Sequence, residues 1–136
     1  MKRKGYLYKE IYKYENVEKA FNEICKNTRN KNRVELFKEN KNIYVSRCIE
    51  ILKNRQYIPS EVNVFTIHEV KKRTIVSQNM MDKLVNHLVA RYILYPSILP
   101  SLLDINVASR KGYGTSKGIE LWKKYQNKFN IKYIKI

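Results

Sequence analysis

Aspartate is scarce in this sequence, and its scarcity limits the chemistry that the chain can perform. Asp82 and Asp104 are the only aspartates among 136 residues, and His68 and His87 are the only histidines. Their spacing indicates neither a carboxylate pair, nor a Ser-His-Asp set, nor a group of metal ligands. We therefore predict no catalytic residue, no metal site and no cofactor within these 136 residues.

Cysteine and long apolar runs are also scarce. Cys25 and Cys48 lie among apolar positions with helical spacing, as small core residues do, and they lack the spacing of metal ligands. No apolar run reaches the length of about 20 residues that a transmembrane helix needs. The start, MKRKGYLYKEIYKYE, lacks the apolar region of a signal peptide. These features predict a reduced, cytoplasmic protein without a membrane partner.

Negative charge is the third shortage. Lysine and arginine number 28 against 12 acidic residues, which gives a formal net charge of +16 at pH 7. Such repulsion destabilises a compact state unless an anionic partner is near, most commonly nucleic acid and next an anionic membrane surface. The hydrophobic fraction of 43% excludes a disordered basic tail. The eleven tyrosines could stack on bases, although a partly buried core position is the more ordinary role.

Helices are predicted where apolar residues recur with helical spacing. Asn16 is predicted to cap a first helix whose apolar residues begin at Val17 and continue through Ala20, Phe21 and Ile24. A longer helix is predicted over roughly residues 33–54. Its apolar stripe consists of Val34, Phe37, Tyr44, Val45, Cys48, Ile49 and Leu52.

The segment FTIHEVKKRTIV predicts an antiparallel β-hairpin. Two β-prone runs, Phe65–Ile67 and Arg73–Val76, flank a polar centre. Lys71, Lys72 and Arg73 place three consecutive cations at the turn. Such a cluster can reach a phosphate chain, where arginine offers a planar fork and lysine a point charge. Lysine also protects exposed strand edges from aggregation, and the residues alone leave both roles open.

A further helix is predicted after Asn79, which with Asp82 resembles a capping box. Lys83, His87 and Arg91 recur at every fourth position and form a basic stripe along this helix. The apolar face of the helix consists of Met81, Leu84, Leu88, Tyr92 and Tyr95, widened by Val85 and Val89.

A basic, glycine-containing turn follows a proline-bounded loop. SRKGYGTSKG places Arg110, Lys111 and Lys117 around Gly112 and Gly114, just ahead of a predicted helix. Glycine allows close approach of the backbone, and a helix N-terminus offers free N–H groups to phosphate. The turn matches neither a Walker loop nor GxGxxG, and an ordinary helix-terminating turn is the alternative. The closing IKYIKI predicts a strand that needs a sheet to join.

Taken in order, these segments resemble the fingers region of bacterial reverse transcriptases, such as those of retrons, diversity-generating elements, abortive-infection systems and group II introns. The family pattern is F-x-I-x-x-PKKR-x-I, a helix opening with D-R, a proline-bounded loop, an R-x-G-x-G-T turn and a helix. Val70 stands in place of the pattern's proline, and Lys83 in place of its helix arginine. The matching segments read FTIHEVKKRTIV, MDKLVNHLVARYILYPSIL, VASRKGYGTSKGIELW and KYIKI, and the resemblance covers nearly the whole chain.

The resemblance implies an α+β, mainly helical fold with about four to five helices, a small antiparallel β-hairpin and a terminal strand. This is the fingers subdomain of a right-hand polymerase, here a single domain over residues 1–136. It comprises N-terminal helices in 1–60, the hairpin in 61–78, helices and the basic turn in 79–130, and the first strand of a missing palm in 131–136.

The function implied is that of the fingers portion of an RNA-directed DNA polymerase. Its partners would be an RNA template, a DNA or RNA primer, an incoming dNTP and the palm of the same protein. The palm aspartates would hold Mg²⁺ in the complete polymerase, so this chain alone should be inactive. The alternatives are a non-catalytic basic nucleic-acid-binding module and an abortive-infection polymerase that acts without a template.

The resemblance also assigns binding roles to individual residues. The nucleotide-binding residues would be Lys71, Lys72, Arg73 and Ile75, where Ile75 shares a strand face with Arg73. The template-binding residues would be Phe65, Lys83, His87, Arg91, Arg110, Lys111, Gly112, Gly114 and Lys117.

Overall fold

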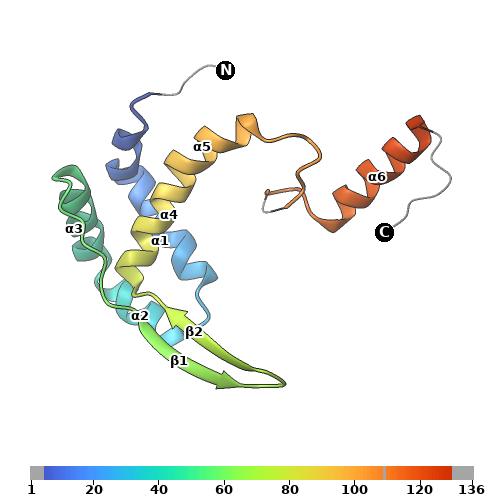
Figure 1. The fold of residues 1–136 in the computed structure, drawn as a ribbon. Coiled ribbons are helices and arrows are strands. Elements are labelled where there is room, and N and C mark those ends of the chain that lie inside the picture. The colour runs from blue at the N-terminus through green and yellow to red at the C-terminus, as the bar shows by residue number, and fades with distance from the viewer. Residues whose placement is uncertain (1–4, 109, 130–136) are drawn as a thin grey trace. The chain divides into compact units, whose positions relative to one another are not determined.

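The chain folds into two compact units in a computed structural model that describes residues 5–108 and 110–129 (Figure 1). The first unit extends to Leu99, and the second begins at Pro100. The predicted strand over residues 131–136 lies outside the described residues. The grouping of residues 1–136 into one fingers-type domain stays a prediction.

The first unit is helical apart from one β-hairpin, which confirms the prediction of a mainly helical α+β fold. Its elements are the 3₁₀ helix η1 (Leu7–Tyr12), α1 (Tyr14–Asn27), α2 (Lys31–Glu39), α3 (Lys41–Lys53), β1 (Asn63–His68), β2 (Lys72–Ser77), α4 (Met80–Val89), the π-helix η2 (Ala90–Leu94) and α5 (Tyr95–Ile98).

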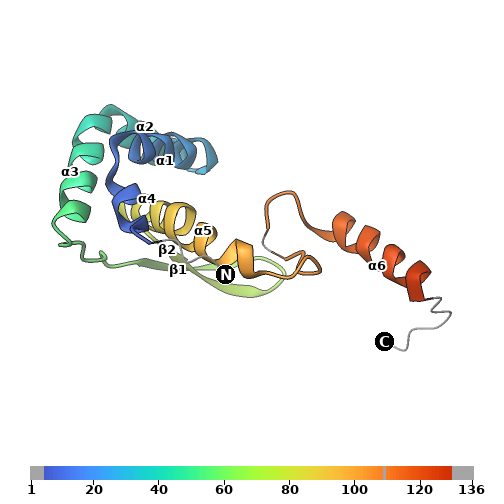
Figure 2. The same cartoon turned by 90° about the horizontal axis from the view of Figure 1, so that it is seen from above.

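One apolar core lies between the helices of the first unit. α1 packs against α3 and α4, while η1 packs against α3 and η2 (Figure 2). The predicted stripes face inward because their residues recur once per helical turn. The buried apolar residues are Ile11, Val17, Ala20, Phe21, Ile24, Cys25, Val34, Phe37, Val45, Cys48, Leu52, Met80, Leu84, Val85 and Leu88.

The first long helix begins earlier than predicted. α1 starts at Tyr14, and its N-cap residue, Lys13, makes no side-chain capping bond, so the prediction that Asn16 caps this helix is wrong. Instead, the Asn16 side-chain amide donates a hydrogen bond to the Glu10 carbonyl at 2.8 Å. An acceptor on the preceding 3₁₀ helix thus engages the Asn16 amide and ties η1 to the start of α1.

The predicted helix over residues 33–54 is two helices, α2 and α3, separated at Asn40. The Asn40 amide donates to the Leu36 carbonyl at 3.0 Å, a local bond by which asparagine competes with helix continuation. The break serves the core, because Phe37 stacks on Phe21 with ring centroids 4.3 Å apart and meets Tyr44 at 4.5 Å. The apolar stripe was therefore predicted correctly, but its continuity was not.

The predicted hairpin forms, but its strands have six residues each and are longer than the predicted runs over 65–67 and 73–76. The two strands are antiparallel and pair from Asn63 opposite Ser77 to His68 opposite Lys72. The loop between them contains Lys71, whereas Lys72 already belongs to β2. The loop end extends away from the helices of this unit (Figure 1).

The helix after the hairpin is capped by Asn79 as predicted, but the Asp82 carboxylate bonds to Tyr57 and Ser60 and does not complete the predicted capping box. The Asn79 side chain accepts a hydrogen bond from the Asp82 backbone N–H at 2.8 Å. Beyond Val89 the helix widens into the π-helical turn η2. A π turn advances fewer degrees per residue than an α turn, so residues beyond it move off the original face. Tyr95 was predicted on the core face, and it is 51% exposed instead.

The boundary between the units falls within the 3₁₀ turn η3 (Leu99–Ser101), and the second unit continues with a long loop and α6 (Thr115–Phe129). Gly112 and Gly114 in this loop have φ angles of 78° and 152°, a backbone region that favours glycine. The described residues thus contain six α-helices rather than four or five, because the long helix divides at Asn40 and α5 forms a separate short segment.

Candidate nucleic-acid interface

One face of the hairpin gathers three of the residues that the sequence singled out. Phe65 lies opposite Ile75, and Ile67 lies opposite Arg73. Opposed residues in an antiparallel pair share a face, so these four side chains belong to the same face. The prediction that Arg73 and Ile75 share a strand face is confirmed. Phe65, predicted separately as a template contact, falls on that face as well.

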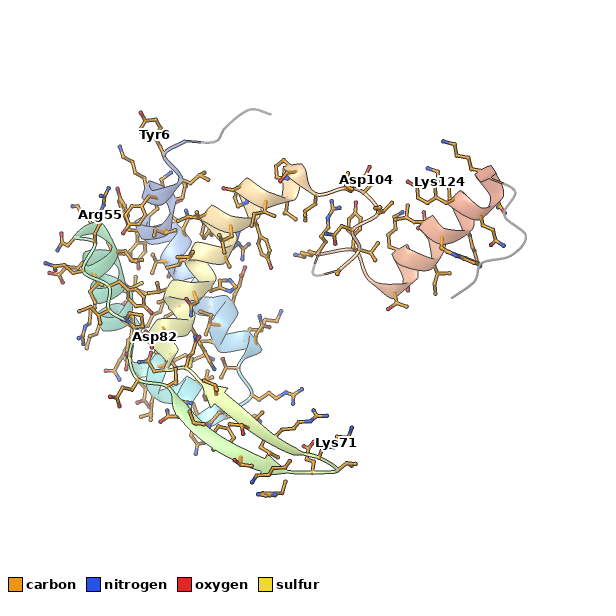
Figure 3. All side chains as sticks on the ribbon, viewed as in Figure 1. Tyr6, Arg55, Lys71, Asp82, Asp104 and Lys124 are labelled. Carbon is orange, nitrogen blue, oxygen red and sulfur yellow. The ribbon has the colours of Figure 1, made fainter. Side chains whose placement is uncertain are left out.

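The hairpin is almost entirely exposed. Every residue of β1 is exposed, and only Ile75 and Ser77 of β2 are half-buried. Val70 in the loop is 100% exposed, and Lys71 beside it marks the tip of the unit (Figure 3). A two-stranded hairpin with so little buried surface contributes little to the core, so its sequence is free to serve a surface role.

The hairpin cations form no ion pair within the described residues, although Glu69 lies in the same loop as Lys71. Among the ion pairs within residues 5–108 and 110–129, none involves Lys71, Lys72 or Arg73. Their charges therefore face solvent without neutralisation, and they are available to phosphate groups.

The base of the hairpin is tied to α2. The Arg33 guanidinium donates a hydrogen bond to the Ser77 hydroxyl at 3.4 Å. Ser77 lies two residues beyond Ile75 on β2 and therefore belongs to the same face. A continuous strip thus leads from Arg73 near the loop end to Arg33 at the helices.

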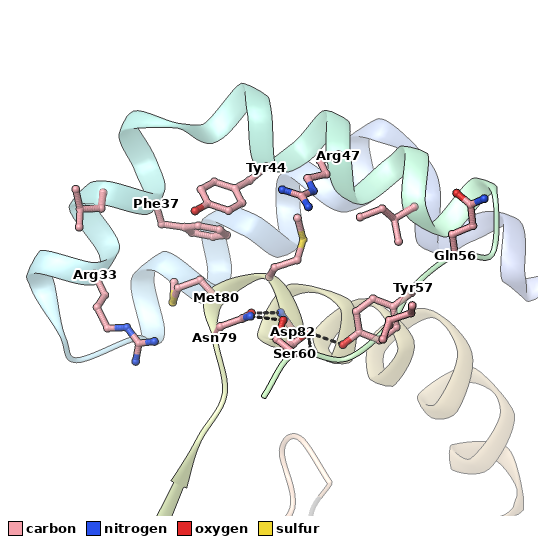
Figure 4. A pocket seen from close by; sticks show the side chains of 14 residues that line it. Arg33, Phe37, Tyr44, Arg47, Gln56, Tyr57, Ser60, Asn79, Met80 and Asp82 are labelled. Carbon is pink, nitrogen blue, oxygen red and sulfur yellow. Dashed lines mark hydrogen bonds between the residues drawn. The ribbon is translucent and has the colours of Figure 1, made fainter. Parts of the chain in front are cut away.

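Arg33 also lines a pocket of about 550 Å³ between the α2–α3 pair and the start of α4 (Figure 4). α2 and α3 contribute Arg33, Phe37, Tyr44 and Arg47 to one side of the pocket. The opposite side consists of Tyr57 and Ser60, from the segment before the hairpin, with Asn79, Met80 and Asp82 from the start of α4.

Asp82 organises the polar side of this pocket. Its carboxylate accepts hydrogen bonds from the Tyr57 hydroxyl at 2.7 Å and from the Ser60 backbone N–H at 3.2 Å. Burial and the bond to Asp82 raise the pKa of Tyr57 to about 12, so the hydroxyl remains a donor at neutral pH. The Asn79 amide donates to the Ser60 hydroxyl at 2.6 Å and closes the cluster.

The predicted basic stripe on α4 is divided by an acidic residue of α1. His87 and Arg91 both contact the Glu23 carboxylate, the histidine through Nε2 at 2.9 Å. Burial raises the pKa of Glu23, but hydrogen bonds from Arg91 and His87 outweigh it and hold the pKa below its ordinary value. These two side chains therefore hold α4 and η2 against α1, whereas Lys83 is half-buried and has no ion-pair partner within the described residues.

In the second unit, the basic turn is partly engaged in its own structure. The Arg110 guanidinium donates to the Leu103 carbonyl at 3.2 Å and lies 4.0 Å from the Tyr113 ring centroid. Lys117 pairs with Glu120 at 2.7 Å. Lys111, Gly112 and Gly114 lie in the turn itself, where Lys111 and Gly112 are exposed and Gly114 is half-buried. Four of the five predicted residues thus lie in or next to the turn, and Lys117 lies in the first turns of α6.

Sequence reasoning missed Arg33, Arg47 and the cluster around Asp82. Arg33 and Arg47 precede buried residues of α2 and α3, which is an ordinary position for a solvated cation. For Asp82, the only signal in the sequence was its position three residues after Asn79, which is the spacing of a helix cap. The signal that joins them is tertiary, because the α2–α3 break brings these helices against the start of α4.

No protein-family model matches this sequence, and no curated protein matches it. Among the described residues, no group of three or more histidine, cysteine, aspartate or glutamate side chains is placed to hold a metal ion. No helix in the described part of the chain has both the length and the apolar character needed to cross a membrane.

Proposed function

We propose that this chain is the fingers portion of an RNA-directed DNA polymerase, and that its hairpin contacts the template and the triphosphate of an incoming dNTP. The sequence motifs and their order support this function. The observation that carries it is the hairpin register, which places the exposed Phe65 and Arg73 and the half-buried Ile75 on one face, next to Lys71 and Lys72.

The chemistry of this face suits a nucleotide beside a template base. Arg73 would bind phosphoryl oxygens with its planar fork, while Lys71 and Lys72 add point charges nearby. Charge that spreads over phosphoryl oxygens is stabilised by such preorganised cations. Ile75 and Phe65 are opposed in the sheet and offer an apolar surface on which bases can stack.

A non-catalytic nucleic-acid-binding module is the second candidate. The observation in its favour is that the first unit encloses an apolar core formed by its own helices. The reading frame downstream of Ile136 separates the two candidates. An aspartate followed by strand and helix patterns and a later x-D-D supports the polymerase, whereas a stop codon supports the module.

RNA binding over a range of salt concentrations tests the proposed surface. If about six phosphates are neutralised, log K should fall with log salt at a slope of about −4 to −5 on single-stranded RNA. Replacement of Lys71, Lys72 and Arg73 by alanine should make this slope shallower by about 2, because up to three phosphate contacts are lost. Fluorescence anisotropy of a labelled oligonucleotide measures both quantities.

The matched control removes three charges elsewhere. Lys26, Lys38 and Lys53 are exposed residues of α1, α2 and α3, and their replacement by alanine changes the net charge equally. This control variant should keep most of the affinity and the slope. Equal losses in the two triple variants would show that the net charge matters and the hairpin does not, and that outcome would contradict the proposal.

A further inference from the structure

The pocket between α2, α3 and the start of α4 combines two kinds of surface. Arg33 and Arg47 bring positive charge, and Arg47 is exposed with no ion-pair partner in the described part of the chain. Tyr44 and Tyr57 are half-buried and bring ring surface. The one acidic residue of the lining is Asp82, whose carboxylate accepts hydrogen bonds from Tyr57 and Ser60, so the two arginines leave the pocket with a net positive charge.

The size and the lining suit a small organic group that is both flat and anionic. A volume of about 550 Å³ falls within the range of ligand pockets in proteins, which is about 300–1,000 Å³. Tyrosine rings and arginine planes stack on unpaired bases, and amide and hydroxyl groups pair with base edges. Ser60, Asn79 and Gln56 supply such groups around the same pocket. An acidic peptide would use the arginines and leave the rest of this lining unmatched.

The pocket is also reached from the hairpin. Arg33 lines the pocket and donates to Ser77, which shares the hairpin face with Arg73, Ile75 and Phe65. A single strand with its phosphates on the hairpin cations can therefore continue along this face to the pocket. The hairpin and the pocket belong to the same unit, so this path depends on no contact with the second unit.

We infer that this pocket binds one unstacked nucleotide of the single-stranded nucleic acid that follows the hairpin. The base lies against the rings of Tyr44 and Tyr57, and its phosphate is held by Arg33 and Arg47. This inference rests on the proposed function, because it requires that the hairpin bind a single strand.

Photo-cross-linking with a short oligouridine that carries one 4-thiouridine tests the inference in the full 136-residue chain. Cross-links mapped by mass spectrometry should fall on Tyr44 or Tyr57 as well as on the hairpin. Arg47→Glu should abolish the pocket cross-links and keep those on the hairpin. It should also weaken binding about 5- to 150-fold, the range expected for one stacked base.

Lys53→Glu is the matched control, because Lys53 is exposed on the same helix and does not line this pocket. It should weaken binding less and keep the pocket cross-links. Thermal melts of both variants should match that of the parent chain, since both positions are exposed.

The alternative outcomes separate the two proposals. Cross-links confined to the hairpin, with Arg47→Glu no weaker than Lys53→Glu, would overturn the pocket inference and leave the proposed function standing. Absence of any RNA binding at low salt would overturn both. If oligoglutamate of equal charge binds as tightly and is equally sensitive to Arg47→Glu, the pocket is a site for acidic peptides and the nucleotide assignment is wrong.

Discussion

Asp82, which the sequence placed only near a helix cap, has a wider structural role. It is 3% exposed, and it is the only buried charged side chain among the described residues. A buried carboxylate is costly unless it is hydrogen-bonded, and Asp82 accepts from Tyr57 and from the Ser60 backbone. Its charge therefore holds the segment before the hairpin against the start of α4.

Tyr57→Phe tests this role. The substitution removes one donor and leaves the buried carboxylate less satisfied, so the free energy of unfolding should fall by about 1–3 kcal/mol. Tyr95→Phe is the control, because Tyr95 is exposed and its ring size is unchanged. Urea unfolding followed by circular dichroism measures both variants. Equal stability of the two would show that the Tyr57 bond contributes nothing to folding.

Arg73 is a second single residue with a testable role, and its predicted role is in binding rather than in folding. Arg73→Ala should leave the thermal melt unchanged, because Arg73 is exposed and unpaired within the described residues. In a chain extended through a palm, Arg73→Ala should lower kcat/KM for the dNTP. The expected loss corresponds to about 1.5–3 kcal/mol of transition-state stabilisation, the range for a charge-assisted hydrogen bond. Arg73→Lys should recover only part, since the fork is lost. Unchanged kinetics in Arg73→Ala would remove Arg73 from the nucleotide site.

At the scale of elements, Glu23 is the polar link between α1 and the α4–η2 helix. It receives His87 from α4 and Arg91 from η2, so two predicted template contacts meet a single carboxylate. The π turn that carries Arg91 changes the phase of the helix and leaves Tyr95 outside the core. The link therefore lies where the helix departs from regular geometry.

Glu23→Gln should reduce stability at neutral pH by about 0.5–1 kcal/mol, because the carboxylate is only partly shielded from water. The pKa of Glu23 is lowered in the folded chain, so its contribution is complete above the unfolded pKa and is lost as the pH falls through the folded one. The difference between parent and variant should therefore shrink below about pH 4.5.

Urea unfolding at several pH values measures this difference. Glu35→Gln on α2 is the control, because Glu35 is exposed and takes part in no ion pair within the described residues. It should show little change at any pH. A stability difference for Glu23→Gln that persists undiminished in acid would contradict the ionic origin of the link.

At the scale of the whole molecule, the 136 residues should not polymerise nucleotides. Two-metal catalysis needs carboxylates around ions that lie about 3.5–4 Å apart. Asp82 is buried, and its carboxylate already accepts hydrogen bonds from Tyr57 and the Ser60 backbone. Primer extension with Mg²⁺ should give no product with residues 1–136, whereas a chain that carries the downstream frame should be active. Template-dependent synthesis by residues 1–136 alone would require another catalytic site.

Local patterns predicted much of the fold because local physics decides them. Alternating β-prone residues on either side of a polar turn specify the hairpin, and its register follows from the turn. Asn79 caps α4 because its side chain needs a donor only three residues away. Apolar spacing identified the core face of α1, which lies within one element and needs no knowledge of its neighbours.

Long-range contacts decided the rest. The charge, most of the helix stripes, the hairpin and the shared face of Arg73 and Ile75 could be predicted from the sequence itself, because each depends on residues a few positions apart. The pairing of the two strands added Phe65 to that face. Tertiary structure alone turned Asn16 toward Glu10, placed Glu23 between His87 and Arg91, and joined Arg33 and Arg47 to Asp82 in one pocket. These interacting residues either compete with local hydrogen bonds or lie far apart in the sequence. Local sequence patterns therefore cannot predict their contacts.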